Sequence, residues 1–421
     1  MGAAALLLLA ALAAPPAGAE QDVSRRHAER GAPSGVRWVL AATEDGVRVG
    51  VPVVDADPNR GVTLGVMPVW VKLSSGSLRR ITAPLVTYNR TVGVGAGCDF
   101  YLYPSSGSSL ELYGSIAQRS DRELYAEWNS APFGARAMSW DGHAQVVRDA
   151  SRRFFGVGPR APQDAETDFT LASVNYVAGV IIPVAPGSHW ALRVKNIFQA
   201  VRILPGPRRD LPDVEDKHPG ATDSRRRLVD DALRLGLIYD TLDSPNTASR
   251  GLYAKAFLDA ARDGWVSDMS YRRWGGIFKA YLPIAGAPGR EPHAILAFQA
   301  HAEELNGNVP FWVLPSLGGK YSFRAYGDGR FVDHFMSVAQ SELRLRVYGA
   351  DYDGTPVSLW ADPFIGAGLV APSAGRAELG TVRPLYGIAL RAVVRPQVVG
   401  SLDVGIGQEG PKVFVDLNYA F

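Results

Sequence analysis

Alternation of apolar residues with polar or small residues, at a period of two, runs through most of this chain and strongly limits its fold. In Lys412–Phe421 the odd positions carry Val, Val, Leu, Tyr and Phe, whereas the even positions carry Lys, Phe, Asp, Asn and Ala. Residues 384–394 and 398–408 repeat the pattern, and in 92–103 glycine fills much of one face. Because successive side chains of a β-strand point to opposite faces, this period predicts an all-β protein.

The composition then excludes several classes of protein. The hydrophobic fraction of 47% with 20% charged residues excludes intrinsic disorder, and the net charge of +2 gives no basic field for nucleic acid. Past the N-terminus no uncharged apolar run reaches the length of a membrane helix, which excludes a multi-helix membrane protein. Strands with one apolar face, 45 glycines and many aromatic residues favour a membrane β-barrel over the alternative, a soluble β-sandwich.

The N-terminus predicts export. An Ala/Leu run, Ala3–Ala14, is followed by two prolines and by the small residues Ala17–Ala19, as in a secretory signal peptide; a membrane anchor is the alternative. We therefore expect a signal peptide at 1–19, a periplasmic segment at 20–46 and a barrel domain at 47–421 in the bacterial outer membrane, surrounded by its lipid.

Alternation and turn residues together predict a transmembrane barrel of sixteen antiparallel strands, an even number that leaves both termini in the periplasm. Short connections such as 89–91, 182–188 and 395–397 are expected in the periplasm, and 139–153 is expected to form a short helix. The long connections expected outside the cell are 132–165, 204–229, 305–330 and 371–383. The predicted strands are 61–72, 78–88, 92–103, 108–119, 122–131, 166–181, 189–203, 230–241, 251–262, 267–283, 292–304, 331–349, 356–370, 384–394, 398–408 and 411–421.

The C-terminal third resembles the barrel of the BamA/TamA-type outer-membrane assembly superfamily, also called the bacterial surface antigen family. Ser316–Gly319 followed by Phe323–Gly327 is similar to that family's Gly-Gly approach and Arg-Gly-aromatic loop element, with Ala325 in place of the Gly. Weaker matches are Tyr239–Asp243 with Gly251–Tyr253, Ser341–Arg344, Phe364–Gly368 (where Gly366 replaces an Asp), Phe154–Gly158, and Pro52 with Asp57, Pro58 and Gly61.

The resemblance implies a sixth extracellular loop that folds into the barrel and is anchored there by an arginine. Arg324 takes the arginine position, with Tyr326, Gly318 and Gly319 as the other loop-anchor residues. Because a guanidinium stays charged, it needs acidic partners when it is removed from water. Alternation places Glu342 and Asp403 on the lumen side, so these two carboxylates are the predicted partners.

The same resemblance implies a non-enzymatic function in protein insertion or translocation, through a seam between the first and last strands. On the predicted strands this seam joins Gly61–Lys72 to Pro411–Phe421, and Tyr419 with Phe421 resembles the C-terminal signal of barrel precursors. Unfolded outer-membrane or secreted proteins are the expected partners. The chain has no room for the family's periplasmic transport-associated modules, so we expect a barrel-only member, monomeric or assisted by a periplasmic partner.

Two other functions stay open from the sequence. The first is a passive channel or transporter of the same architecture. The second is a lipase-like enzyme, for which Ser188 and His189 are the neighbouring nucleophile and base. The sequence has no zinc-protease motif. The calcium-like run from Asp55 has Arg60 where a calcium loop needs glycine, and no helix follows the G-x-G-x-x-G run at Gly405–Gly410. We therefore expect neither a metal nor a cofactor.

Overall fold

The structure is a computed structural model that describes residues 40–43, 46–74, 77–105, 107–135, 137–221, 226–244, 247–264, 266–286, 292–352, 355–394 and 397–416. Its strands are β1 (Leu40–Thr43), β2 (Gly46–Asp57), β3 (Gly61–Ser74), β4 (Ser77–Asn89), β5 (Gly93–Leu102), β6 (Ser109–Ala117), β7 (Arg122–Asn129), β8 (Ser139–Phe154), β9 (Thr167–Pro183), β10 (Trp190–Pro205), β11 (Leu228–Asp240), β12 (Gly251–Ala261), β13 (Tyr271–Ala285), β14 (Ala294–Gly307), β15 (Ser316–Leu317), β16 (Phe331–Val332), β17 (Phe335–Tyr352), β18 (Thr355–Ala371), β19 (Arg383–Val394), β20 (Gln397–Gly407) and β21 (Gly410–Asp416). The helical elements are α4 (Val214–Lys217) and the 3₁₀ turns η1 (Gln163–Ala165), η2 (Ala374–Arg376) and η3 (Leu379–Thr381).

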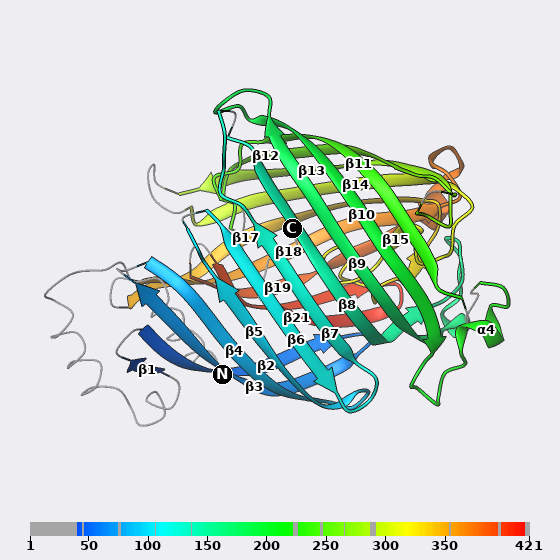
Figure 1. Cartoon of the computed structure of the whole chain (residues 1–421), viewed down its shortest axis with the longest axis horizontal. Helices are drawn as coiled ribbons and strands as arrows, with labels where there is room; N and C mark the ends of the chain where they lie inside the picture. Colours follow the sequence, from blue (N-terminus) through cyan, green and yellow to red (C-terminus); the bar gives the residue numbers. More distant parts are fainter. Residues whose placement is uncertain are drawn as a thin grey trace, which may run out of the picture.

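One antiparallel sheet of 19 strands makes up the wall of the molecule, and its strands run obliquely round a cylinder (Figure 1). Each strand pairs with the next along the chain, with β14 pairing directly to β17. The small strands β15 and β16 lie in the connection between β14 and β17 and pair with each other. β2 and β21 lie beside each other and nearly close the sheet into a barrel. Within the described part of the chain, no strand pairing joins them.

The two faces of the sheet differ as a barrel in lipid requires. Large apolar side chains are exposed on the outer face of nearly every strand. A soluble protein of this size rarely exposes so much apolar surface. The exposed side chains include Val62, Leu64, Val66, Val86, Leu124, Val146, Leu192, Leu233, Leu235, Leu282, Ile365, Tyr386 and Leu390. The inner face is polar over much of the sheet, and carries buried charged groups on β17–β20. Among the described residues, no helix has the length and apolarity needed to cross a membrane.

The prediction of an all-β antiparallel barrel is confirmed, but the predicted number of strands is wrong. Apart from the four-residue β1, eighteen strands form the wall, so that two were missed among the sixteen. One is β2, which contains Pro52 and Asp57, two of the residues given above as a weak match to the family. Pro52 has no N–H to donate, and it lies in the part of β2, Gly50–Asp57, that has no second strand paired to it among the described residues.

The other missed strand is β8, which covers the residues expected to form a short helix. Its Ala, Gln and Arg residues are good helix formers, and this local preference hid a weak alternation. Trp140 and Val146 lie on its exposed face, and β8 pairs along its length with β7 and β9. Pairing on both sides therefore overrides the helical propensity of the segment.

Because β8 was not predicted, the connections that precede it were predicted at the wrong end of the barrel. Each additional antiparallel strand reverses the side on which the next turn lies. The 89–91 connection was predicted to lie with 182–188, yet the structure places the 90–92 turn at the opposite end, with the long connections. Arg119, in the neighbouring 118–121 turn, donates a hydrogen bond to the backbone oxygen of Arg90 over 3.1 Å.

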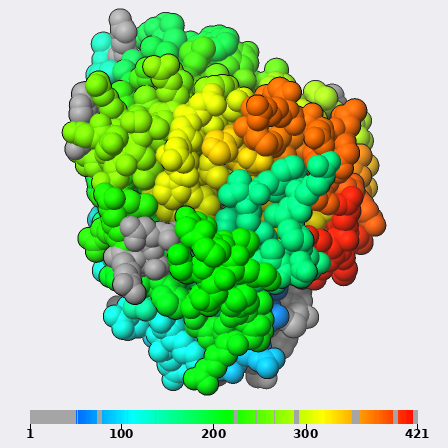
Figure 2. All heavy atoms as spheres, turned by 90° about the vertical axis from the view of Figure 1, so that its right-hand side faces the viewer, coloured from blue at the N-terminus to red at the C-terminus, as the bar shows by residue number. Residues whose placement is uncertain are grey.

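At that end, called the loop-bearing end here, long connections cover the barrel. Figure 2 faces it and shows residues 155–166 in blue-green, 206–221 in green, 308–334 in yellow and 372–382 in orange packed against one another. The structure does not show the expected inward-folded loop as such. It shows a segment, 308–334, that belongs to this cover and contacts the polar face of β17–β20.

Some predictions fall on residues outside those that the structure describes. The signal peptide at 1–19 and nearly all of the segment at 20–46 are among them, although β1 and the first residue of β2 lie in the latter range. The terminal residues Tyr419 and Phe421 also lie outside the described ranges.

Candidate functional site

Two glycines shape the tip of the 308–334 segment. Gly318 and Gly319 have φ angles of +139° and +86°, a region that favours glycine. A Cβ atom on Gly318 would lie 2.0 Å from the carbonyl oxygen of Gly327. The Gly319 amide donates to the Tyr326 carbonyl over 2.9 Å, and the Phe323 amide donates back to Gly319 over 2.9 Å. These contacts close a compact turn that fixes the residue between them, Arg324.

The Arg324 side chain is fully buried and lies between the two predicted acidic residues. Its Nη2 is 2.6 Å from Oε1 of Glu342 on β17, and its Nη1 is 2.7 Å from Oδ2 of Asp403 on β20. The guanidinium plane also lies 3.8 Å from the ring centroid of Phe364 on β18. One side chain thus connects three strands with charge-assisted hydrogen bonds and a cation–π contact.

Three further charged side chains, which were not predicted as site residues, complete the cluster. Arg391 on β19 contacts Glu342, Asp362 and Asp403. Arg344 on β17 donates to Glu342 over 3.2 Å. The cluster therefore holds three guanidinium groups, of Arg324, Arg344 and Arg391, and three carboxylates, of Glu342, Asp362 and Asp403. This balance matters because an uncompensated charge in a buried site is strongly unfavourable.

Alternation does carry a signal for these missed residues. Arg344 lies two positions after Glu342, and Asp362 lies two before Phe364, so each shares the inward face of its strand. What the sequence cannot give is the register that brings Arg391 level with them. In the structure Arg391 pairs with Trp360 on one side and with Ser401 on the other, which places it between Asp362 and Asp403.

Tyr326 anchors the segment to the β20–β21 hairpin. Its hydroxyl accepts a hydrogen bond from the Gln408 amide over 3.0 Å, and its ring stacks on Phe323 with centroids 5.3 Å apart. Glycine on β20 makes room for the segment. A Cβ on Gly405 would lie 2.2 Å from the Arg324 carbonyl oxygen, and one on Gly407 would lie 2.7 Å from the Tyr326 ring.

This arrangement accounts for Ala325, which stands where the resembling family has glycine. Ala325 is fully buried, in one cluster with Leu317, Phe323, Phe364 and other apolar side chains. The space for a close backbone approach comes from the glycines of β20, rather than from residue 325 itself.

The seam lies one strand earlier than predicted. Gly61–Lys72 belongs to β3, which pairs with β2 on one side and with β4 on the other. The strand beside β21 is β2. On β2, the short strand β1 pairs with Gly46–Val49, so β2 from Gly50 to Asp57 has no second strand paired to it among the described residues. The edge that could accept another strand is thus on β2 and β21.

A polar cavity of about 430 Å³ lies against the inner faces of β6–β10 at the loop-bearing end. Glu123, Gln145, Asn175 and Gln199 line it, with Trp312 from the 308–334 segment. The Gln145 amide donates to Glu123, and Asn175 donates to Gln145 over 3.1 Å. Amides and carboxylates at this density suit a water-filled space.

The chain's other candidate chemistry does not assemble in the structure. The Ser188 hydroxyl accepts from the Trp190 amide over 3.0 Å, and Nδ1 of His189 lies 3.0 Å from the backbone oxygen of Asp240, so these contacts do not make a nucleophile–base pair. Within the described ranges, no group of three or more His, Cys, Asp and Glu residues lies in an arrangement that could hold a metal ion.

Comparison with known proteins agrees with this architecture. BamA from Haemophilus ducreyi, in a crystal structure lacking POTRA domains 1–3, superposes with a TM-score of 0.53 at 15% identity, over 87% of this chain and 74% of that chain. CdiB from Escherichia coli gives 0.56 at 12% identity, over 87% of this chain and 66% of that one. The chain shares their barrel fold. No protein-family model matches the sequence, and neither does any curated protein.

Proposed function

We propose that this protein resides in a bacterial outer membrane and assists the insertion or translocation of unfolded outer-membrane or secreted proteins through the seam between β2 and β21. The observation that carries the proposal is the seam, where β2 and β21 are neighbours and no ladder joins them within the described residues. An unpaired strand edge is a template for an added strand, because its backbone N–H and C=O groups are already aligned. The fold shared with BamA and CdiB supports the same reading.

The cluster around Arg324 also supports the proposal, because it holds the strands next to the seam in fixed register. A barrel that opens at one boundary needs the neighbouring strands to stay in register. Ion pairs of Arg324 and Arg391 with Glu342, Asp362 and Asp403 connect the four strands β17–β20, and β20 continues into the hairpin that carries β21. The edge strand β21 is therefore presented by a braced wall, which suits the pairing of an incoming strand.

The test ties the seam and measures insertion. Val54 on β2 and Val413 on β21 are exposed, and each lies three residues from the loop-bearing end of its strand, at Asp57 and Gly410. Cysteines at these two positions, with Cys98→Ser to remove the native thiol, can be joined by a cleavable bismaleimide. In liposomes containing the protein, an unfolded barrel substrate should become protease-protected faster than in empty liposomes. Joining the seam should abolish the gain, and cleaving the linker should restore it.

Equal insertion rates with the seam joined and free would refute the proposal.

A second candidate, a passive channel, is favoured by the polar cavity of about 430 Å³. Steady ion conductance in planar bilayers, unaffected by the linker and without any effect on substrate insertion, would decide for the channel.

A further inference from the structure

We propose that Gly327–Arg330 is a latch that holds the seam closed at the loop-bearing end. The seam ends there in two turns, 58–60 after β2 and 408–409 before β21. The latch contacts both of them, through Asp328 on the β2 side and Arg330 on the β21 side. It thus bridges edge strands that no ladder joins in the described part of the chain.

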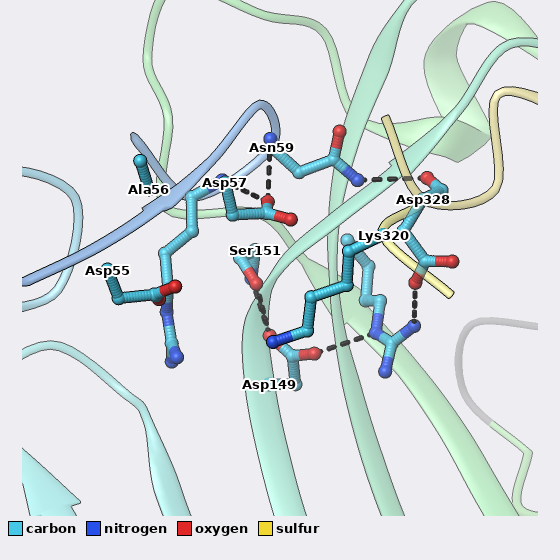
Figure 3. A pocket seen from close by; sticks show the side chains of 10 residues that line it. Asp55, Ala56, Asp57, Asn59, Asp149, Ser151, Lys320 and Asp328 are labelled. Carbon is cyan, nitrogen blue, oxygen red and sulfur yellow. Dashed lines mark hydrogen bonds and ion pairs between the residues drawn. The ribbon is translucent and has the colours of Figure 1, made fainter. Parts of the chain in front are cut away.

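On the β2 side, the contact is made through Asn59. The Asn59 side-chain amide donates to the backbone oxygen of Asp328 over 2.9 Å, as Figure 3 shows from close by. Gly327 permits this approach, because a Cβ there would lie 2.3 Å from Oδ1 of Asn59. Asp57 holds the turn itself, since its carboxylate accepts from the amides of Asn59 and Arg60 over 2.8 and 3.0 Å.

A neighbouring strand supports the same contact. The Asp328 carboxylate lies 2.8 Å from Nη1 of Arg152 on β8, an ion pair whose two side chains are about half exposed. Arg153, with its side chain fully buried, donates from Nη2 to the Asn59 backbone oxygen over 2.9 Å. These contacts surround a polar cavity of about 200 Å³, so this side of the latch is reached by water.

On the β21 side, the contact is buried and charged. The Arg330 Nε donates to both carboxylate oxygens of Glu409, over 2.8 and 3.0 Å. Its guanidinium lies between the rings of Phe155 and Phe331, at 4.3 and 4.4 Å from their centroids. Nη2 also donates to the backbone oxygen of Ala161 over 3.0 Å. The side chain of Arg330 is 4% exposed, so little water competes for it.

The two sides therefore differ in strength. An exposed neutral hydrogen bond is weaker than a buried, charge-assisted bidentate one. When the seam opens, the latch should separate from Asn59 first and stay with Glu409 on the β21 side. Gly329, with a φ of +69°, lies between the two contacting residues.

The latch matters for function only if the seam opens, so it rests on the proposed function, but its test measures the seam alone. In a Val54→Cys, Val413→Cys, Cys98→Ser variant, nitroxide labels on the two new cysteines report the distance between β2 and β21. This distance is measured in liposomes by pulsed electron paramagnetic resonance. The parent should give one short, narrow distance. Glu409→Gln removes the charge at nearly constant shape and should raise the long-distance population by at least about tenfold.

Asn59→Ala provides the second variant, because it alters the exposed side and leaves the buried ion pair intact. It should also raise the long-distance population, by a smaller factor. Glu378→Gln is the matched control. It breaks an exposed ion pair with Arg160, 2.6 Å long, at the same end of the barrel but outside the residues of both seam turns. It should leave the distances unchanged. Retained heat-modifiable migration on gels verifies that each variant is a folded barrel.

The latch is overturned if both folded variants keep the parent distances, or if Glu378→Gln shifts them equally. The outcome for insertion is separate. If the variants widen the seam while substrate insertion stays at the rate of empty liposomes, the latch stands and the proposed function fails. If insertion depends on the seam but the distances ignore the latch variants, the proposed function stands and the latch fails.

Discussion

Replacing Arg324 with alanine tests whether the charged cluster braces the barrel. The change leaves three carboxylates facing two guanidinium groups in a buried site. Glu342 retains Arg344 at 3.2 Å and Arg391 at 3.3 Å, but Asp403 retains an arginine only at 3.5 Å. Removing one partner of a buried ion pair costs about 3–5 kcal/mol, because the other charge stays buried. We therefore expect Arg324→Ala to lower the free energy of unfolding by about that amount.

The measurement is urea unfolding of the barrel in detergent micelles, followed by heat-modifiable migration and by tryptophan fluorescence. Adding Asp403→Asn to Arg324→Ala restores the balance to two positive and two negative groups, so the double variant should recover a large part of the loss. Arg160→Ala, in an exposed ion pair with side chains 72% and 61% exposed, should change the stability by at most about 1 kcal/mol. The charge-balance reasoning would be refuted if Arg324→Ala lowered the free energy of unfolding no more than Arg160→Ala does. It would also be refuted if the double variant lost the sum of the losses of Arg324→Ala and Asp403→Asn measured separately.

Two further predictions concern backbone approach and protonation. Gly405→Ala places a Cβ 2.2 Å from the Arg324 carbonyl oxygen, so it should unseat the 308–334 segment and increase its cleavage by added protease, whereas Gly400→Ala, with no atom within 4 Å, should not. In the 206–227 connection, the hydrogen bond from Arg208 lowers the pKa of Asp210 to about 2. Its folded pKa lies below the unfolded value of about 3.9, so the interaction stabilises the connection above that pH and is lost as the pH falls towards 2. Carboxyl NMR should show the Asp210 midpoint moving up in Arg208→Gln, and an unchanged midpoint would contradict this assignment.

The alternation of side chains was enough to predict the faces of most strands. All sixteen predicted spans overlap strands of the wall, and the apolar residues of the C-terminal segments, such as Tyr386, Leu390 and Leu402, lie exposed on the outer face. This succeeds because a strand between water and lipid must separate its residues by face, whatever its neighbours are.

The two missed strands show where the pattern is insufficient. β2 lies at the boundary of the sheet, where its pairing with β3 on one side makes it a strand. In β8 the helix formers dominated, although strand pairing decides the conformation. Both errors concern tertiary context, which a single sequence does not contain. The error at β8 then reversed the side of every earlier turn.

The site shows the same division. The pairing of Arg324 with Glu342 and Asp403 follows from chemistry and face, because a buried guanidinium needs inward carboxylates. The participation of Arg391 follows from register across β18–β20, and register is set by the whole sheet. The latch residues Asp328 and Arg330 gave no signal, since charged residues in a long loop are ordinarily solvated.

The energetics of lipid favour the proposed opening at the seam over opening at any other boundary of the described sheet. Between β9 and β10, fifteen residue pairs are in register, and separating them would leave backbone groups unsatisfied in hydrocarbon at several kcal/mol each. Between β2 and β21 no such ladder has to be broken in the described part of the chain. The unpaired edges are costly in the resting barrel for the same reason, and a strand added to them would satisfy those groups. The same term that keeps the other boundaries closed therefore favours pairing of an incoming strand at this one.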